Sequence, residues 1–315
     1  MTTITCSAPG SIIFTGKYTA SEYPSVVAAI NQHFTVSVTP IDDPVLDISS
    51  DLCGPCTINL STLSAPPTYQ YTLSSFKQFL PQLRHQGFQI VYHKNTMVDK
   101  QLGMNAAITV ILSSAFYHYL HHHTNLGDIF RIASQAVSAV RPDSSCAEVA
   151  ASTYGKIIHH TEKNKSHPTL IESFLSDLPL FAVYSGTITS ESIAIKRCLI
   201  RERSFPSIYS KLHAILGDLS HLFFQELKNN NVKKLGELME IGQGILSTNK
   251  LQTKETQEIL SRLDHTETVY GAKITGPGLG GCVIGLGTIE QEILAPFELI
   301  PLQIEHTGVR ILPSP

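Results

Sequence analysis

The chain of 315 residues lacks the features that mark membrane, secreted and nucleic-acid-binding proteins. No apolar run reaches the roughly 18 residues that a bilayer-spanning helix needs, and residues 1–6 have neither the basic nor the apolar part of a signal peptide. A basic patch is also missing, because 23 basic and 26 acidic residues are spread along the chain with a net charge of -3. We therefore expect a cytoplasmic protein without a nucleic-acid or membrane partner.

Cysteine is scarce as well, and six cysteines in a chain of this length argue against a disulfide framework. Cys53 and Cys56 have the Cys-X-X-Cys spacing of a thioredoxin-type redox site, but a strand-like segment follows them in place of the required helix. His118 and the three histidines at 121–123 lie at the polar end of a predicted helix. For the cysteine pair the sequence favours a surface turn over a redox site. For the histidines it favours a solvated helix end over a metal site.

What the sequence does contain is enough apolar material for a sizeable core, with 42% hydrophobic and 16% charged residues. A chain of this length favours two packed domains over one. A strand-like segment at 180–184 opens the second half, and we place the domain boundary just before it. The expected domains are therefore residues 1–178 and residues 179–315.

Apolar periodicity predicts the order of strands and helices. In the first half, strands are predicted at residues 4–7, 11–15, 33–38, 89–93 and 153–158, and helices at 71–86, 108–120 and 127–140. Ala8, Pro9 and Gly10 are expected to separate the first two strands, and Pro81 to kink the first helix. In the second half, helices are predicted at 207–227, 232–246 and 253–263, the first of them with an inward face of Ile208, Leu212, Ile215, Leu219, Leu222, Phe223 and Leu227.

A glycine-rich loop within residues 273–286 is the most distinctive stretch of the chain. An apolar segment leads into Gly276, Gly278, Gly280 and Gly281, and an apolar run of strand character follows. Glycines this dense can form an anion-binding nest or simply a tight hairpin between buried strands, and the loop alone leaves both open. No Gly-Lys-Ser/Thr closes the loop, which excludes a Walker phosphate loop.

Two further segments place small or polar residues at the start of predicted helices. Residues 101–107, Gln-Leu-Gly-Met-Asn-Ala-Ala, lead into the helix at 108–120, an arrangement that can set a helix N-terminus against an anion. Residues 143–152 are mostly small and polar, and after Asp143 they contain one more acid, Glu148.

Taken together, three segments resemble the galactokinase–homoserine–mevalonate–phosphomevalonate (GHMP) kinase superfamily. They are residues 8–18 with Ala8-Pro9-Gly10 and Gly16-Lys17-Tyr18, residues 102–107, and residues 275–282. Their order and spacing match that family over nearly the whole chain. The resemblance implies an α+β fold of two domains, an α/β domain like ribosomal protein S5 followed by a ferredoxin-like α+β domain, with the active site in the cleft between them.

Within the superfamily the resemblance is divided between two branches. Residues 235–246 and 308–311 are similar to mevalonate kinases, whereas residues 16–18 and 145–151 are more similar to phosphomevalonate kinases. A galactokinase and a diphosphomevalonate decarboxylase share the fold but fit these segments less well.

The resemblance implies ATP-dependent phosphorylation of the hydroxyl of mevalonate, with ATP and Mg²⁺ as cofactors and phosphomevalonate as the alternative substrate. In the family the second segment wraps the nucleotide phosphates, an acid at the position of Glu148 acts on the substrate hydroxyl, and the third segment supports the site. The residues expected at the site are Glu148 and Lys17 for catalysis, Leu102, Gly103, Met104, Asn105, Ala106, Gly276, Gly278, Gly280 and Gly281 for the nucleotide, Ser11, Tyr18 and Ser145 for the substrate, and Asn105 and Asp143 for the metal.

Four departures from the family pattern bear on activity. Ser11 stands where the family usually has lysine, Met104 and Asn105 replace two serines, Glu148 replaces aspartate, and residues 129–142 contain no acid for the metal. Methionine cannot donate a hydrogen bond, and a side chain one methylene longer displaces a base by about 1 Å, to which catalysis is sensitive.

Two interpretations follow. In the first, the protein is a divergent kinase in which Lys17 reaches the site from the far end of the first hairpin. In the second, the fold is retained without catalysis and the protein is a binding or regulatory module, with a homodimer as one way for it to act. We prefer the kinase, with a nucleotide and a small-molecule substrate as its partners.

Overall fold

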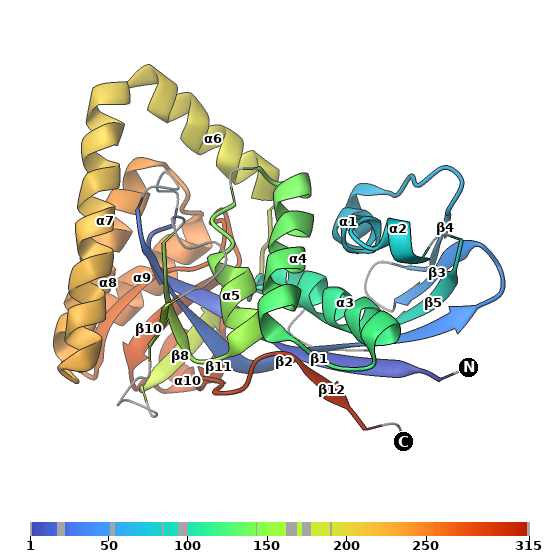
Figure 1. Cartoon of the computed structure of the whole chain (residues 1–315). Helices are drawn as coiled ribbons and strands as arrows, with labels where there is room; N and C mark the ends of the chain where they lie inside the picture. The colour runs from blue at the N-terminus through green and yellow to red at the C-terminus, as the bar shows by residue number, and fades with distance from the viewer. Residues whose placement is uncertain are drawn as a thin grey trace.

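The fold is described from a computed structural model that covers residues 2–17, 23–50, 54–83, 85–93, 100–142, 144–161, 169–171, 178–189 and 191–313. Within these residues the chain forms two β-sheets, each packed against its own group of helices (Figure 1). The architecture is α+β, as the sequence predicted.

The first sheet is built on a long hairpin near the N-terminus. Its main strands run in the order β12-β1-β2-β5-β3-β4, and β6 and β7 extend it from β2. The strands are β1 (Ile4–Thr15), β2 (Ser25–Ile41), β3 (Val45–Ser50), β4 (Cys56–Asn59), β5 (Gly87–Tyr92), β6 (Ile157–His160), β7 (Thr169–Ile171) and β12 (Arg310–Leu312). Because β12 pairs with β1, the two ends of the chain lie at one edge of this sheet (Figure 1).

Helices cover one face of the first sheet and enclose an aromatic core. They are η1 (Pro67–Tyr69), α1 (Gln70–Lys77), α2 (Leu80–Leu83), α3 (Met104–His121), α4 (Leu126–Val140) and α5 (Ala147–Tyr154). Phe116 of α3 is fully buried, and its ring centroid lies 5.6 Å from that of Phe76 and 5.2 Å from that of Phe88. The helix predicted at 71–86 is broken into α1 and α2 near Pro81, because proline cannot continue the backbone ladder.

The second sheet has the order β11-β8-β10-β9, and every neighbouring pair is antiparallel. Its strands are β8 (Leu180–Tyr184), β9 (Val269–Ile274), β10 (Cys282–Gly287) and β11 (Glu298–Leu302). The helices of this half are α6 (Glu191–Ser204), α7 (Pro206–Lys228), α8 (Val232–Thr248), α9 (Lys254–Asp264) and α10 (Gln291–Leu294). Helix α8 packs along β9, and Phe223 of α7 stacks on Phe14 of β1, which joins the two halves.

The break predicted at residues 8–10 of β1 is wrong. The strand continues through these residues, and its register against β2 shifts between Pro9 and Gly10. A bulge of this kind absorbs a proline within a strand. The other edge of β1 is paired with β12 only at residues 5–7, so Pro9 interrupts no ladder there.

The strand predicted at 153–158 is wrong in its first residues, because Thr153 and Tyr154 belong to helix α5. The helix ends at Gly155, whose φ of +74° is a left-handed conformation that glycine adopts without strain. The backbone of His306 and Thr307 lies where a Cβ of residue 155 would be. The switch from helix to strand is therefore set by a distant segment of the chain.

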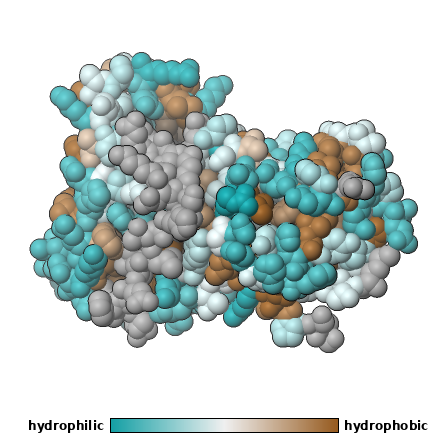
Figure 2. All heavy atoms as spheres, in the orientation of Figure 1, coloured by the Kyte–Doolittle hydropathy of each residue, from teal (hydrophilic) through white to brown (hydrophobic). Residues whose placement is uncertain are grey.

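The inward face predicted for α7 is only partly right. Leu219, Phe223 and Leu227 are buried, but Ile208, Ile215 and Leu222 are 54%, 45% and 47% exposed. Each exposed residue lies next to a buried one, since Tyr209, Leu216 and Phe223 are buried, so the buried face of α7 is narrower than its apolar pattern. On the face shown in Figure 2, hydrophobic side chains interrupt the hydrophilic surface where α6 and α7 project from the rest of the molecule.

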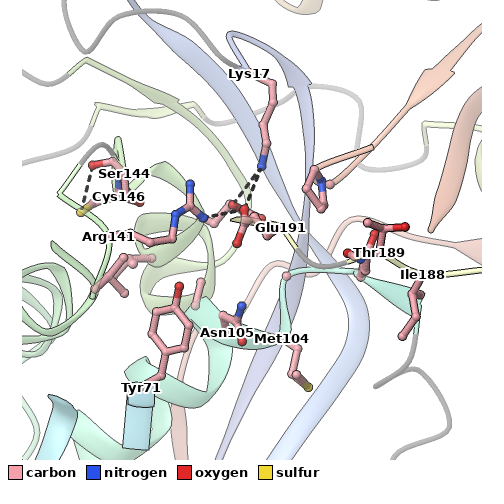
Figure 3. A pocket seen from close by; sticks show the side chains of 18 residues that line it. Lys17, Tyr71, Met104, Asn105, Arg141, Ser144, Cys146, Ile188, Thr189 and Glu191 are labelled. Carbon is pink, nitrogen blue, oxygen red and sulfur yellow. Dashed lines mark hydrogen bonds and ion pairs between the residues drawn. The ribbon is translucent and has the colours of Figure 1, made fainter. Parts of the chain in front are cut away.

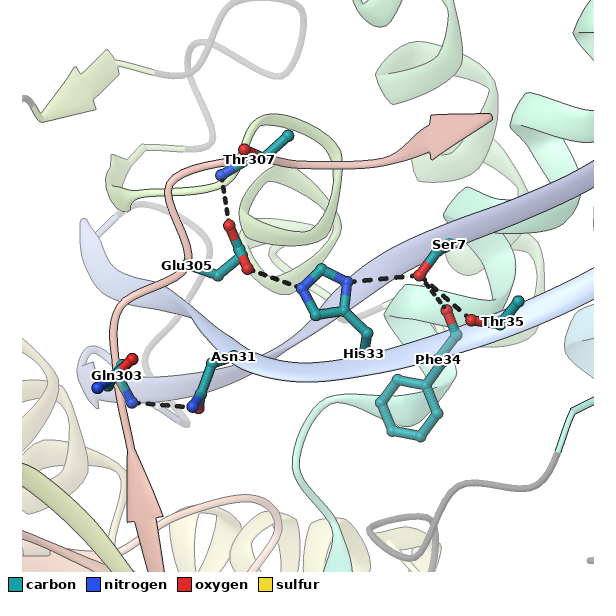
Figure 4. A network of polar contacts seen from close by, with 8 residues as sticks. All are labelled: Ser7, Asn31, His33, Phe34, Thr35, Gln303, Glu305 and Thr307. Atoms are coloured by element: carbon teal, nitrogen blue, oxygen red, sulfur yellow. Dashed lines mark hydrogen bonds and ion pairs between the residues drawn. The ribbon is translucent and has the colours of Figure 1, made fainter. Parts of the chain in front are cut away.

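A polar network ties the segment between β11 and β12 to the first sheet (Figure 4). His33 Nε2 lies 2.8 Å from Glu305 Oε2, and its Nδ1 lies 3.4 Å from Ser7 Oγ. The arrangement has the residue types of a hydrolytic triad, but Ser7 is 3% exposed and its hydroxyl donates to the Phe34 carbonyl. The network is therefore a structural link rather than a nucleophilic site.

We expect this link to contribute stability that is lost in acid. Burial raises the pKa of Glu305, but hydrogen bonds from His33 and from the Thr307 N–H outweigh it and hold the pKa below its ordinary value. The contribution is therefore present above about pH 4.5, the ordinary glutamate value, and falls as the pH drops through the lower folded-state pKa. Glu305→Gln should cost about 1 kcal/mol at pH 7 in urea unfolding, and less near pH 3.

The matched control is Glu292→Gln, an exposed residue of α10, which should leave the unfolding free energy unchanged at both values of pH. An equal loss for Glu305→Gln at pH 7 and pH 3 would show that the carboxylate charge does not contribute.

Candidate active site

A cavity of about 360 Å³ lies where the three resembling segments meet. Both halves of the chain line it. The first half contributes residues of α1, α3, α4 and α5 and of the turn after β1, and the second half contributes the start of α6, the stretch before it and the stretch after β9. Its lining residues are Lys17, Tyr71, Gln101, Gly103, Met104, Asn105, Ala106, Val137, Arg141, Ser144, Cys146, Glu148, Val149, Ile188, Thr189, Glu191, Gly276 and Pro277.

The first and second segments are in direct backbone contact. Ser11 N–H donates to the Leu102 carbonyl at 3.1 Å, and Gly103, with a φ of +79°, lies directly over Ser11. A Cβ on Gly103 would be 2.3 Å from Ser11 Oγ, so only glycine fits. This contact positions the N-terminus of α3 in the wall of the cavity.

No side chain caps the start of α3, and Met104, Asn105 and Ala106 of its first turn line the cavity. The first N–H groups of a helix have no intrahelical partner, and the helix dipole adds partial positive charge there. The wall of the cavity therefore favours an anionic ligand at this end.

The third segment is a tight hairpin between β9 and β10, closed by a hydrogen bond from Thr275 N to Cys282 O. Gly276 reaches the cavity, whereas Gly280 packs on the Thr187 carbonyl and Gly281 on Gln101. The third segment is thus a tight hairpin, and one end of it, at Gly276 and Pro277, lines the cavity.

Gln101 connects this hairpin to the second segment. Its backbone and side chain lie against Gly276 and Gly281, and its Nε2 donates to the Thr189 carbonyl at 2.8 Å. Gln101 thus joins the second segment, the hairpin and the loop before α6 at one point.

Four charged side chains meet within the cavity. Lys17 Nζ lies 3.8 Å from Glu148 Oε2 and 3.8 Å from Glu191 Oε1, and Arg141 donates to the same Glu191 oxygen at 2.5 Å. Figure 3 shows Lys17, Arg141 and Glu191 pointing toward one another from three different elements. The four side chains are only 11–26% exposed, so water screens these pairs less than pairs at the surface.

Two neighbouring groups shape the environment of these charges. Cys146 has a φ of +55° at the N-cap of α5, which turns the chain so that Glu148 enters the first turn of that helix. Burial raises the pKa of Tyr71 to about 12, although the nearby Arg141 lowers it in part, so Tyr71 is a neutral hydrogen-bonding group at pH 7.

The structure brings about half of the expected site residues to the cavity. These are Lys17, Glu148, Gly103, Met104, Asn105, Ala106 and Gly276. The others among the described residues do not line the cavity, namely Ser11, Leu102, Ser145, Gly278, Gly280 and Gly281. Tyr18 and Asp143 lie outside the described residues.

Several lining residues were missed at the level of sequence, above all Tyr71, Arg141 and Glu191. Arg141 lies within residues 129–142, which contain no acid, and no motif marks its guanidinium group as part of a site. Tyr71 and Glu191 belong to helices without a motif, and only the fold brings them beside Lys17.

The described residues offer few ligands for Mg²⁺. They contain no group of three or more His, Cys, Asp and Glu side chains with a metal-binding arrangement. Mg²⁺ in kinases is held by one or two carboxylates together with phosphate oxygens and water. Glu148, Glu191 and the Asn105 amide are the lining oxygen donors that fit this pattern, and a cation there would compete with Lys17 and Arg141.

A buried lysine lies next to this charged group. Lys273 of β9 is 3% exposed, and its Nζ donates to the carbonyls of Ile13 at 3.0 Å and Ile274 at 2.8 Å. Burial, and to a smaller extent the positive charge of Lys17, together lower the pKa of Lys273 to about 7.

The chain is similar to known proteins in both sequence and structure. Residues 223–294 match the family described as GHMP kinases C terminal. The mevalonate kinase of Methanothermobacter thermautotrophicus is 26% identical over 282 residues, 88% of each chain, and that of Archaeoglobus fulgidus is 26% identical over 97% of this chain and 98% of the relative.

Solved structures of low sequence identity have the same fold. A Lin0012 protein from Listeria innocua has a TM-score of 0.82 at 16% identity, with 99% and 100% of the two chains covered. The mevalonate kinase of Methanococcus jannaschii has a TM-score of 0.75 at 18% identity and 96% and 98% coverage. A Streptococcus pneumoniae phosphomevalonate kinase in complex with phosphomevalonate and AMPPNP has a TM-score of 0.72 at 13% identity and 96% and 100% coverage.

The chain is therefore a protein of the GHMP kinase fold with a GHMP kinase C-terminal segment, and the resemblance found in its sequence is confirmed. Its named relatives are mevalonate kinases. Within the described part of the chain, no helix is both long and apolar enough to cross a membrane.

We expect Gly103→Ala to disrupt the contact that places α3. The new methyl group would face Ser11 at a positive φ, so unfolding in urea should show a loss of about 2–4 kcal/mol. Gly242→Ala in α8 is the control, because no atom lies within 4 Å of its Cβ position. That change should be neutral or stabilise the protein by up to about 1 kcal/mol, and similar results for both variants would contradict the assignment.

Lys273 gives a prediction of pH dependence. Its folded-state pKa of about 7 is below the ordinary value of 10.5, so the unfolded chain binds more protons between these values and stability rises with pH across that window. Lys273→Met should flatten this rise in urea unfolding between pH 6 and pH 10. Lys233→Met, at an exposed position of α8, should retain it; a rise that persists in Lys273→Met would assign it to other groups.

Proposed function

We propose that the protein is an ATP-dependent kinase that phosphorylates the hydroxyl group of mevalonate. The observation that carries this proposal is the pair of Lys17 and Glu148, 3.8 Å apart, in a cavity that also contains the start of α3. A carboxylate that can accept a proton, a cation beside it and an anion-binding helix N-terminus are the groups that phosphoryl transfer needs.

In the proposed reaction the oxygen of the substrate hydroxyl attacks the γ-phosphorus of ATP. The bond from that phosphorus to the β–γ bridging oxygen breaks, ADP leaves, and the hydroxyl proton passes to Glu148. Lys17 lies beside Glu148 and would stabilise negative charge on the reacting oxygens. Mg²⁺, when bound, supplies further neutralisation of the phosphates.

The choice of substrate rests on the relatives and on charge. The relatives named above are mevalonate kinases, and mevalonate is a hydroxy acid. Arg141 adds a second cation to the cavity, which suits an acidic acceptor. Phosphomevalonate carries even more negative charge and is the alternative acceptor.

A binding or regulatory module without catalysis is the second candidate, and one observation favours it. Ser11 stands where the family usually has lysine, is 2% exposed and lies beneath Gly103, so the wall above it is closed. Among the described lining residues, a catalytic cation would then have to be Lys17 or Arg141, and Lys17 is the one beside Glu148. Under either function we propose that the cavity lies between a first unit, residues 1–178, and a second unit, residues 179–315.

The kinase proposal predicts release of ADP in a coupled assay with mevalonate or phosphomevalonate. Glu148→Gln should lower kcat by about 10²–10⁴-fold, because the carboxamide cannot accept the hydroxyl proton. Its affinity for ATP, measured by calorimetry, should remain nearly unchanged. Glu237→Gln, an exposed residue of α8, is the control and should retain full activity.

No turnover with either acceptor, together with no rise in melting temperature on addition of ATP, would refute the kinase. Binding of ATP without turnover would instead support the module without catalysis. Full activity in Glu148→Gln would show that another group accepts the proton.

A further inference from the structure

The two cations of the cavity converge on one oxygen atom. Among the described lining residues Lys17 and Arg141 are the basic ones, and both contact Glu191 Oε1, at 3.8 Å and 2.5 Å. Lys17 comes from the end of β1, Arg141 from the end of α4, and Glu191 from the first turn of α6. A carboxylate from the second half of the chain thus sits between two cations of the first half.

The geometry around Glu191 is that of a bound anion. A guanidinium group binds carboxylate and phosphate oxygens strongly through charge-assisted hydrogen bonds, and an ammonium group adds a second positive charge. All three side chains are at least three-quarters buried, with exposures of 11% for Lys17, 25% for Arg141 and 21% for Glu191. An oxyanion of a ligand would meet the same two donors in the same place.

The charged side chains that line the cavity balance one another. Lys17 and Arg141 contribute two positive charges to the cavity, and Glu148 and Glu191 contribute two negative charges. With Glu191 in position, a phosphate or carboxylate that enters meets a group whose charges sum to zero. With Glu191 displaced, it meets a net positive charge, which favours anion binding.

We propose that Arg141, together with Lys17, is the anion-recognition site of the cavity, and that Glu191 is an internal carboxylate that occupies this site until a phosphate or carboxylate of a ligand replaces it. The proposal deepens the kinase function and rests on it only for the identity of the ligand. It makes Arg141 a specificity-determining residue, and it makes the start of α6 the element that is released when the ligand binds.

A purely structural role for the Arg141–Glu191 pair predicts different behaviour. If the pair only held the start of α6 against the end of α4, removal of the Glu191 charge would lower the free energy of unfolding. The affinity for anions would then stay the same or become weaker. If Glu191 competes with the ligand, the same change must strengthen anion binding, because the competing carboxylate is gone.

The test measures binding by isothermal calorimetry without turnover, with three probes: pyrophosphate, mevalonate and AMPPNP. Glu191→Gln keeps the size of the side chain and removes its charge, and it should bind at least one probe about tenfold more tightly than the unchanged protein. Arg141→Gln should bind that probe about tenfold more weakly, and the double variant Arg141→Gln with Glu191→Gln should show no gain.

Two controls lie on the same helices, away from the cavity. Glu202→Gln on α6 and Arg131→Gln on α4, where Arg131 is 52% exposed and pairs with Asp128, should leave the affinities unchanged. Melting curves with and without pyrophosphate provide a second readout, since the stabilisation by pyrophosphate should be larger in Glu191→Gln than in the unchanged protein.

The probes also identify the source of the anion. Tighter binding of mevalonate alone would assign the site to the acidic group of the acceptor, and tighter binding of AMPPNP alone would assign it to the nucleotide phosphates. Unchanged or weaker binding of all three probes by Glu191→Gln would overturn the proposal, whatever the result of the kinase assay. A protein that binds anions in this way without turnover would refute the kinase and leave the anion site standing.

Discussion

The backbone hydrogen bond from Ser11 to Leu102 is the contact on which the candidate site depends. It requires glycine on both sides, because a Cβ on Gly10 would be 2.4 Å from the Leu102 carbonyl and a Cβ on Gly103 2.3 Å from Ser11 Oγ. Through this contact the end of β1 and the start of α3 become one wall. Gln101, the residue before Leu102, then holds the glycine hairpin of the second half against that wall.

Once this wall is formed, charge becomes the next constraint. The two halves bring Lys17, Arg141, Glu148 and Glu191 together in one cavity, and burying a charge is costly unless an opposite charge compensates it. The balance explains how a site that has lost the usual lysine at position 11 still contains a cation next to an acid. Under the proposed exchange at Glu191, an anionic ligand would replace a carboxylate of the protein rather than enter an empty positive pocket.

Much of the fold was predictable because local patterns agree with tertiary packing. Periodicity located α3, α4 and α8 closely, and the strand predicted at 180–184 is β8. The prediction failed where a distant segment decides the local structure, as at Gly155, where the backbone of residues 306–307 sets the end of α5. It failed again on α7, whose apolar pattern is wider than the face that the fold buries.

For the site itself, the sequence alone determined the three segments, the acid at Glu148 and the absence of the usual lysine, because these are properties of neighbouring residues. Only the tertiary structure decided which charges meet. Arg141 and Glu191 lie fifty residues apart in segments without a motif, and their 2.5 Å contact exists because two sheets pack with α4 and α6 facing one cavity. Pairing across such a distance depends on the assembled fold, so no local pattern records it.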